Sequence, residues 1–441
     1  MIYGFLLILV LYCILCYLLC NKEILSPGFF CALMYLLGVI VLFFKKDEWR
    51  VDIRVDTVFL IFLFLLFILI GDLVASVFEQ SKVRTYRRLS KIYLALPNWL
   101  LVLLSGMMIL TLVFYFRDTI TIASRAGWTG DYRSLLQYAR MAKNIYETYV
   151  STIAQYMSYV CEAINYFCLF IFCNNTCNCK ARVKNEIKYL IPILGYVGIA
   201  VLTTGRTLLL RIVFFVLVVL LLQLYKNNNW RNVRIGRILK LIIFFILIAS
   251  IVFFLAGKLT GKSVDREFFD YVAVYFSSSI AAFNEYMKEP FHNTDSIWGG
   301  HTLYGFYTIL RRFVKTIPIL SSPLEMLTLP GGQTTNIYTP IRRYFQDFGY
   351  TGVIIIAWGI GFFYKKYYNR IKIVSDPFKI LLFAYLFFPL IEIGIEERIF
   401  LDLFTLKTAF VVCGIWFLYR ICCQKCYLED NTNDSGRNCF I

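Results

Sequence analysis

The chain has 441 residues, of which 59% are hydrophobic and 17% are charged, and its formal net charge is +17. Soluble domains have about 45–50% apolar and about 25% charged residues, so this composition excludes an ordinary soluble protein. Apolar stretches of about 20 residues, the length of a helix that crosses a bilayer, recur along the chain. A transmembrane barrel would show short alternating strands instead. The sequence therefore predicts an all-α, polytopic integral membrane protein.

About eleven transmembrane helices are predicted from the lengths of the apolar stretches. They cover residues 2–20, 25–44, 57–78, 95–116, 149–172, 187–203, 206–225, 237–257, 350–367, 378–396 and 402–422. The first stretch lacks a basic start and a small-residue cleavage site, so we expect a retained span rather than a signal peptide. The polar residues Gln424 to Ile441 are expected to form a tail without regular structure.

The basic residues of short loops predict the orientation of the chain in the membrane. They cluster after the third, fifth, seventh and ninth predicted spans, at residues 82–91, 180–188, 231–240 and 365–372. These loops alternate, so the N-terminus is expected outside and the C-terminus in the cytoplasm. Residues 45–54 depart from this rule, because their four basic side chains, interleaved with acidic ones, would lie outside. The net positive charge follows from the cytoplasmic loops, and no nucleic-acid partner is expected.

Two long polar segments are external in this topology, at residues 117–148 and 258–349. The expected organisation is a transmembrane bundle, an extracytoplasmic loop, a group of C-terminal transmembrane helices and a cytoplasmic tail, at 1–257, 258–349, 350–423 and 424–441. Apolar and aromatic residues at helical spacing from Asp270 to Met287 predict an amphipathic helix along the membrane interface. A second short helix is expected from Tyr338 to Gly349, leading into the ninth span.

Arginine on the predicted outer side is the main sign of a binding site. Arg206 begins the seventh span, and Arg211 lies five residues deeper, about 7.5 Å along a helix. A charged side chain inside a span usually faces a polar cavity or a partner, although one near the end can also reach the headgroups. Further arginines lie on the two external segments: Arg125, Arg133, Arg140, Arg342 and Arg343. Guanidinium groups suit phosphate oxygens, and anionic lipid headgroups are the alternative partner.

Three residues are candidates for a general base: Asp347, His301 and Glu396. Asp347 lies two residues before Gly349, at the junction of the loop and the ninth span, so it is a base or a helix cap. His301 follows Trp298-Gly299-Gly300, a neighbourhood typical of sugar contacts, and the alternative is an ordinary surface histidine. His292 is the weaker of the two histidines as a candidate.

The remaining acidic residues of interest are expected to form ion pairs. Glu396 belongs to a group of charged residues near the outer ends of the last two spans, and some of them are expected to form ion pairs that hold helices together. The group comprises Glu392, Glu396, Glu397, Arg398, Asp402 and Lys407. Asp72 and Glu162 lie inside predicted spans. For these two we expect structural hydrogen bonds or a buried cation as partner.

No metal and no cofactor is expected. The sequence has neither a phosphate-binding Walker loop nor a dinucleotide-binding glycine fingerprint, and its outer loops have no Asp-x-Asp pair. Two histidines without neighbouring cysteines make a poor metal site. Two cysteine clusters, at 173–179 and 422–426, are expected in the reducing cytoplasm and lack the paired spacing of a zinc knuckle.

Several of these segments resemble one family of bacterial membrane enzymes. Thr203-Thr204-Gly205-Arg206-Thr207 begins a late span, and a long late loop carries Asn336-Ile337-Tyr338-Thr339-Pro340 and Asp347-Phe348-Gly349. Together with Tyr271 to Tyr286, over about residues 190–400, these resemble the oligosaccharide repeat-unit polymerases of O-antigen and capsule synthesis (Wzy type). The resemblance implies a GT-C-like membrane glycosyltransferase at the outer face of the bacterial cytoplasmic membrane. Its donor and acceptor would be glycans linked to undecaprenyl pyrophosphate.

The resemblance also implies site residues and partners. The family uses external arginines for the lipid pyrophosphate, and by position this role falls on Arg206, Arg342 or Arg343, with Arg125, Arg133 and Arg211 as further candidates. Asn336 and Tyr338 carry over as motif positions on the substrate side. The partners would be the bilayer, the lipid-linked glycans and a chain-length regulator. An O-antigen-type ligase and a flippase or other transporter are the alternatives, although the chain shows no duplicated halves of the kind common in transporters.

Overall fold

The predicted multi-pass helical architecture is confirmed in its main features by a computed structural model. The structure describes residues 1–79, 91–146, 148–230, 233–261, 267–290, 297–318, 324–374 and 376–427. Within these ranges nine helices are long and apolar enough to cross a membrane, and each matches one of the first nine predicted spans.

The last two predicted spans take a different form. Residues 378–396 contain two shorter helices, α14 (Pro377–Leu386) and α15 (Phe388–Ile391), instead of one span. Pro389 lies at the beginning of α15, and proline interrupts a helix because it lacks an N–H and clashes with the preceding turn. The final apolar helix, α17 (Leu406–Ile421), has 16 residues.

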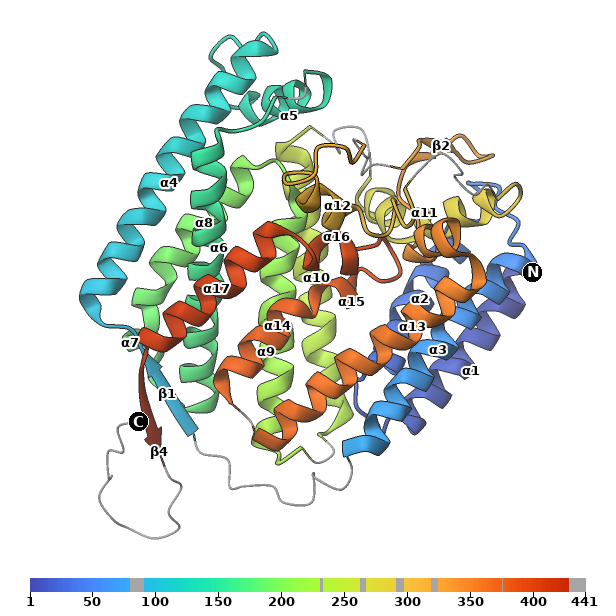
Figure 1. The fold of residues 1–441 in the computed structure, drawn as a ribbon, viewed down its shortest axis with the longest axis horizontal. Coiled ribbons are helices and arrows are strands. Elements are labelled where there is room, and N and C mark those ends of the chain that lie inside the picture. Colours follow the sequence, from blue (N-terminus) through green and yellow to red (C-terminus); the bar gives the residue numbers. More distant parts are fainter. Residues whose placement is uncertain are drawn as a thin grey trace. The chain divides into compact units, whose positions relative to one another are not determined.

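The chain divides into two compact units, which are described separately. Unit 1 comprises residues 1–85, 268–374 and 386–408. Its elements include α1 (Ile2–Leu19), α2 (Pro27–Lys45), α3 (Val55–Glu79), α11 (Phe268–Tyr286), α12 (Tyr304–Leu310), β2 (Leu327–Thr328), β3 (Thr334–Thr335), α13 (Pro340–Val374), α15 and α16 (Ile399–Leu403). Within this unit α1, α2, α3 and α13 run side by side, and α11, α12 and the β2–β3 hairpin gather at one end of them (Figure 1).

Helices α3 and α13 cross at two glycines. A Cβ atom on Gly361 would lie 2.0 Å from the carbonyl oxygen of Ile68, and one on Gly71 would lie 2.2 Å from that of Trp358. Small residues permit such close backbone approach, which is a main source of helix association in membranes. This crossing therefore fixes how the two longest helices of unit 1 pack.

A buried group of four charges joins the α1–α2 connection to the same two helices. The ammonium of Lys365 lies 3.1 Å from a carboxylate oxygen of Glu23 and 3.3 Å from one of Asp72, and Lys372 also pairs with Glu23. Asp72 further accepts hydrogen bonds from the Ser26 hydroxyl at 2.5 Å and the Gly28 N–H at 2.9 Å. Asp72 therefore has the structural hydrogen bonds and the buried cation that the sequence predicts for it.

Helix α11 is confirmed as a helix, but its surroundings differ from an interfacial position with one exposed face. Ser277, Ser278 and Ser279 are all buried, and the Ser279 hydroxyl donates to the carbonyl of Gly394 at 2.9 Å. Its apolar residues pack on α2. The serines explain why α11 is also packed on the side that the aromatic spacing predicts to be exposed. Their side chains are small and their hydroxyl groups are hydrogen-bonded, so neighbouring elements can contact this side of the helix.

The start of α13 matches the predicted short helix from Tyr338 to Gly349. Helical geometry is interrupted at Gly349, where φ is 63° and ψ is −157°. Only glycine adopts this conformation without strain. Pro340 to Phe348 therefore forms a separate short helix, and the apolar span begins after the bend.

The loop at residues 45–54, which departs from the charge rule for membrane orientation, uses basic residues in local contacts. Lys45 pairs with Glu48 at 2.5 Å and also with Asp270 at the start of α11, and Arg54 pairs with Asp56 at 3.1 Å. These contacts tie the end of α2 to α11. Two of the four basic residues that conflict with the orientation rule, Lys45 and Arg54, are therefore paired with carboxylates.

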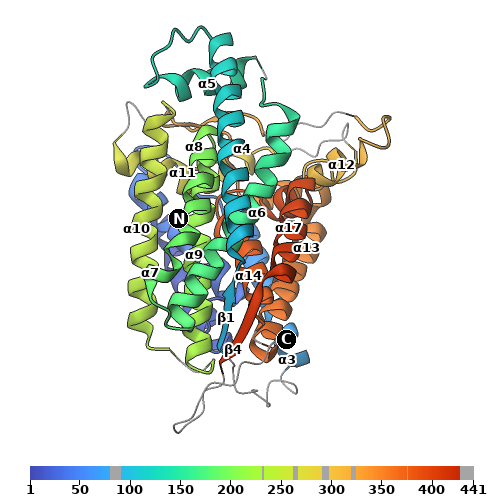
Figure 2. The same ribbon diagram turned by 90° about the vertical axis from the view of Figure 1, so that its left-hand side faces the viewer.

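Unit 2 comprises residues 86–267, 375–385 and 409–441. Its further elements are β1 (Lys91–Ala95), α4 (Asn98–Arg125), α5 (Leu135–Ile145), α6 (Thr152–Cys173), the π-helical turn η1 (Asn174–Asn178), α7 (Val183–Glu186), the 3₁₀ turn η2 (Ile187–Tyr189), α8 (Leu190–Leu202), α9 (Arg206–Asn227), α10 (Ile235–Leu259) and β4 (Cys423–Tyr427). In this unit α8, α9 and α10 lie next to one another, with α5 toward one end of them and the β1–β4 ribbon toward the other (Figure 2).

The β1–β4 ribbon corrects the prediction of an unstructured tail for residues 424–427. Strand β4 pairs antiparallel with β1, from Lys91 opposite Tyr427 to Ala95 opposite Cys423. The side chain of Asn175 in η1 bonds both the N–H and the carbonyl of Leu94, which leaves the other edge of β1 free for pairing. The strand was missed because its partner lies more than 300 residues earlier in the sequence.

We predict that Gly361→Ala destabilises the protein by about 1–3 kcal/mol, because its methyl group would overlap the α3 backbone. Gly359→Ala is the matched control, since no atom lies within 4 Å of the Cβ position there. Both substitutions raise helix propensity by the same amount. The difference in stability between the two variants therefore measures the cost of disturbing the α3–α13 crossing. Thermal unfolding in detergent measures it, and equal melting temperatures would contradict the close packing.

Candidate functional site

Arg342, in the first turn of α13, is fully buried and enclosed by side chains of unit 1. One guanidinium nitrogen lies 2.5 Å and 2.8 Å from the two carboxylate oxygens of Glu325. The guanidinium carbon lies 4.1 Å from the ring centre of Tyr338 and 4.4 Å from that of Tyr286. Such cation–π contacts are strong when desolvated. Arg342 therefore holds the loop residues Glu325 and Tyr338 against α11 and α13.

Arg343 and Asp347 hold the turn that contains His301. Asp347 accepts hydrogen bonds from the main-chain N–H of Thr302 at 2.6 Å and of His301 at 3.4 Å, and Arg343 donates to the His301 carbonyl at 3.0 Å. Arg343 and Asp347 are four residues apart and therefore lie on one face of the helix. The start of α13 thus binds both the carbonyl and the N–H groups of this turn. The structure thus brings together Arg342, Arg343, Tyr338, His301 and Asp347, with Asp347 acting as a cap of the loop.

The surroundings of the His301 imidazole lower its pKa. Burial lowers the pKa of His301, and the positive charges of Arg343 and Arg342 lower it further, against the opposing effect of Asp347 and Glu325. An imidazole with a pKa below its usual value is unprotonated near neutral pH and can accept a proton.

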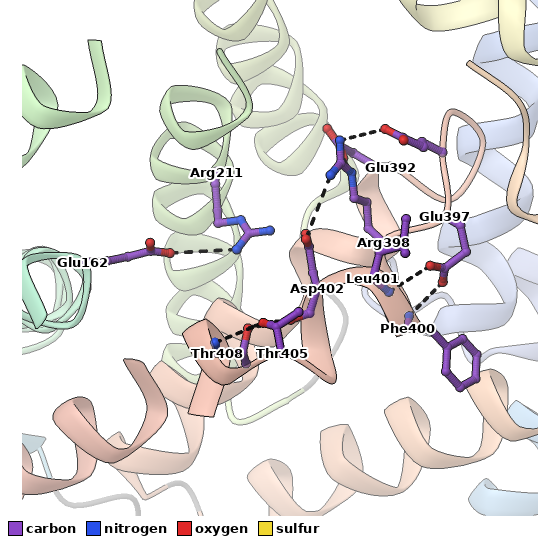
Figure 3. A network of polar contacts seen from close by, with 11 residues as sticks. Glu162, Arg211, Glu392, Glu397, Arg398, Phe400, Leu401, Asp402, Thr405 and Thr408 are labelled. Atoms are coloured by element: carbon purple, nitrogen blue, oxygen red, sulfur yellow. Dashed lines mark hydrogen bonds and ion pairs between the residues drawn. The ribbon is translucent and has the colours of Figure 1, made fainter. Parts of the chain in front are cut away.

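Glu396 is occupied by an ion pair. Arg398 lies 2.7 Å from a carboxylate oxygen of Glu396, 2.9 Å from Glu392 and 3.9 Å from Asp402; Figure 3 shows Arg398 with Glu392 and Asp402. This arrangement confirms the predicted ion pairs among these residues. Glu396 is therefore engaged by Arg398 within unit 1.

Glu397 is a buried carboxyl group whose role the sequence analysis did not identify. It accepts hydrogen bonds from the N–H groups of Phe400 at 2.8 Å and Leu401 at 3.0 Å (Figure 3). It also accepts one from the Tyr344 hydroxyl at 3.0 Å. Burial raises its pKa, and these bonds together with the charge of Arg343 offset only part of that effect. Its position at the start of α16, where acidic side chains cap helices, is the sequence signal for this role.

In unit 2, Arg206 lines an apolar crevice between α8, α9 and α10. The crevice has a volume of about 210 Å³ and is lined mainly by aliphatic side chains, with Thr204, Gly205 and Thr260 beside the arginine. Arg206 is mostly buried, and its guanidinium carbon lies 4.3 Å from the ring centre of Phe253 in α10. The guanidinium group of Arg206 is therefore held against the apolar side chains of the crevice.

Helix α5 brings two more cations to residues at or beside this crevice. Lys143 donates to the carbonyl of Thr203 at 2.9 Å, and Arg140 donates to the carbonyl of Thr260 at 2.7 Å. Thr203 and Thr260 follow the last turns of α8 and α10, where the helix dipole favours positive charge. Burial lowers the pKa of Lys143 to about 8, and no described carboxylate lies within ion-pairing distance of it. Lys143 was not among the predicted site residues, because only the fold brings α5 to the ends of α8 and α10.

Arg211 faces a carboxylate in unit 2. Its guanidinium lies 3.9 Å from Glu162 of α6, and both side chains are more than nine-tenths buried (Figure 3). This pair confirms the buried cation expected for Glu162. Arg211 therefore contributes to helix packing, and its charge is balanced without a ligand.

The other predicted residues lie at the surface or outside the described ranges. Arg125, Arg133 and Asn336 are exposed. Arg125 and Arg133 belong to unit 2, and Asn336 follows β3 in unit 1. His292 lies outside the described residues.

The chain has no match among protein-family models, curated proteins or solved structures. Within the described ranges, no group of three or more His, Cys, Asp and Glu side chains is arranged to hold a metal ion. The two arrangements that geometry singles out are thus the His301 turn in unit 1 and the Arg206 crevice in unit 2.

The buried carboxyl group of Glu397 predicts a pH dependence of stability. Above the usual glutamate pKa of about 4.3, the folded protein keeps a proton that the unfolded chain has released. The free energy of unfolding should therefore fall with rising pH, by up to about 1.4 kcal/mol per pH unit, until the raised pKa is passed. Glu397→Gln should remove this slope.

Thermal unfolding in detergent over a series of pH values measures the effect. Glu289→Gln, at an exposed carboxylate of unit 1, is the control and should retain the wild-type pH dependence. If Glu397→Gln retained it as well, the assignment of this slope to Glu397 would be wrong.

Proposed function

We propose that this protein polymerises oligosaccharide repeat units linked to undecaprenyl pyrophosphate. It would act at the outer face of the bacterial cytoplasmic membrane, as a metal-independent, GT-C-like glycosyltransferase. The reaction transfers a growing glycan from its lipid carrier to the terminal sugar of a new lipid-linked repeat unit. The resemblance of residues 190–400 to repeat-unit polymerases suggests this reaction.

The observation that carries the proposal is the crevice of unit 2, where Arg206 meets apolar walls. A lipid-linked substrate combines a hydrocarbon chain with a phosphate group, and this crevice offers matching chemistry in about 210 Å³. Arg140 and Lys143 add positive charge at the adjacent helix ends. Guanidinium and ammonium groups together suit a diphosphate, because its oxygens accept several charge-assisted hydrogen bonds.

The chemistry requires an acceptor hydroxyl, a base and cations for the leaving group. The acceptor oxygen attacks the anomeric carbon of the donor sugar while the bond from that carbon to the pyrophosphate oxygen breaks. The hydroxyl proton passes to the base, and undecaprenyl pyrophosphate leaves as an anion. Positioning of the two substrates supplies about 7–11 kcal/mol, and one fixed donor at the developing charge supplies about 2.7–4 kcal/mol.

The geometry favours His301 as the base in this proposal. Its imidazole is neutral because burial and the two neighbouring arginines lower its pKa. Asp347 is engaged by two main-chain N–H groups, and Glu396 by Arg398. Arg342 and Arg343 are already bonded within unit 1, so the proposal assigns the lipid diphosphate to Arg206 in unit 2.

A ligase and a flippase are the rival functions, and one deletion experiment separates them. Cells lacking a polymerase should carry single repeat units on their surface glycan. Cells lacking a flippase should carry none, and cells lacking a ligase should keep long chains on the lipid carrier. The buried charges around Lys365 favour a transporter in principle, but they form a neutral set of close ion pairs at the α1–α2 connection.

We expect Arg206→Ala and Arg206→Lys to shorten the glycan almost equally, because an ammonium group does not reproduce a two-pronged guanidinium contact. Loss of this donor should reduce the polymerisation rate about 100- to 1000-fold. Gel analysis of glycan length in a complemented deletion strain measures it. Arg182→Ala, at an exposed arginine of unit 2, is the control, and full-length glycan with Arg206→Ala would refute the role of Arg206.

The lowered pKa of Lys143 predicts that polymerisation declines as the pH rises through about 8. Lys143 is protonated below this pH and becomes neutral above it, so its attraction for phosphate is lost. Lys143→Arg should keep activity at high pH, since arginine stays charged, and Lys143→Gln should lower activity about tenfold at neutral pH. Rates with purified protein across this pH range test it, and an unchanged decline in Lys143→Arg would exclude Lys143 as the cause.

A further inference from the structure

The segment of residues 297–318 in unit 1 is rich in aromatic and basic residues. It contains Arg311, Arg312 and Lys315 and no aspartate or glutamate. Arg311 and Lys315 form no ion pair with any described residue, and both are exposed. This differs from the loop at residues 45–54, where Lys45 and Arg54 are paired with carboxylates.

The same segment exposes large apolar side chains. Phe313 is 82% exposed and Trp298 is 72% exposed, and Phe306 and Val314 are also open to the surroundings. The opposite side of the segment is packed, because a Cβ atom on Gly305 would lie 3.0 Å from the carbonyl oxygens of Phe400 and Phe404 near α16. The apolar residues therefore form a face that points away from the body of unit 1.

Contacts with α13 place this face at the end of a membrane span. The Trp298 ring packs on the Phe348 ring with centres 4.8 Å apart, and the turn at His301–Thr302 is bonded to Asp347. Phe348 immediately precedes the bend at Gly349, after which α13 runs as an apolar span. The segment thus lies at the level where this helix leaves the hydrocarbon.

We propose that residues 298–315 form a membrane-interface anchor that binds anionic phospholipid headgroups. Tryptophan and phenylalanine at this level insert their rings among the headgroups and upper acyl chains. The three basic residues attract the negative surface, each favouring the inserted position about fivefold. The anchor holds the His301 turn from the membrane side while Asp347 and Arg343 hold it from the protein side. The inference depends only on unit 1 spanning a bilayer, and not on sugar transfer.

A fluorescent reporter on the full-length protein tests the anchor. Phe313→Cys is labelled with an environment-sensitive dye and reconstituted into vesicles of phosphatidylcholine alone or of equal parts phosphatidylcholine and phosphatidylglycerol. Signal from native cysteines is subtracted with labelled wild-type protein. We expect blue-shifted emission and loss of more than half of it to lipids brominated in the upper acyl chain, with the larger loss in anionic vesicles.

Two comparisons sharpen the result. A reporter at Thr334→Cys, an exposed polar position of the β2–β3 hairpin, should stay water-exposed. In R311Q/R312Q/K315Q protein carrying the Phe313 reporter, the difference between the two vesicle types should disappear. Monodisperse elution and an unchanged melting temperature show that each variant is folded.

Three outcomes would overturn the proposal. Emission typical of water at position 313 in both vesicle types would mean that the face does not insert. Shielding from a water-soluble quencher without quenching by brominated lipid would mean that a protein or a second copy covers it. Equal quenching in both vesicle types, unaffected by the triple substitution, would remove the anionic headgroup as the partner.

Discussion

The constraint on which this structure depends is the cost of burying charge among apolar helices. An isolated charge in such an environment is strongly unfavourable, and the described buried cations meet this constraint in different ways. Lys365 is enclosed by carboxylates, Arg211 faces Glu162, and Arg342 lies between aromatic rings beside Glu325. Arg206 lies over the ring of Phe253 at the wall of an apolar crevice.

The same constraint separates loops that pack from loops that meet the membrane. At residues 45–54 the pair between Lys45 and Asp270 joins the end of α2 to α11, so this basic residue stabilises the fold. At residues 297–318 the charges have one sign and lie beside exposed aromatic rings. Composition alone ranks both segments as basic, and only the distances between charged groups distinguish them.

The helical pattern was largely predictable because hydrophobic length is a local property. Nine predicted spans correspond to long helices, and the short helix before Gly349 was anticipated from its sequence. Predictions failed where a distant partner decides the structure. Strand β4 exists because β1 lies beside it, and α11 is buried because its serines bond to groups far away in the sequence.

The sequence alone determined the class of protein, the positions of most spans and a set of arginine and acidic residues worth examining, since these depend on composition and local spacing. The tertiary structure decided what each of those residues does. It made Asp347 a loop cap, placed Glu396 in an ion pair, lowered the pKa of His301, and brought Lys143 to the helix ends near Arg206. The physical reason is that burial, pairing and pKa arise from atoms that meet only after folding.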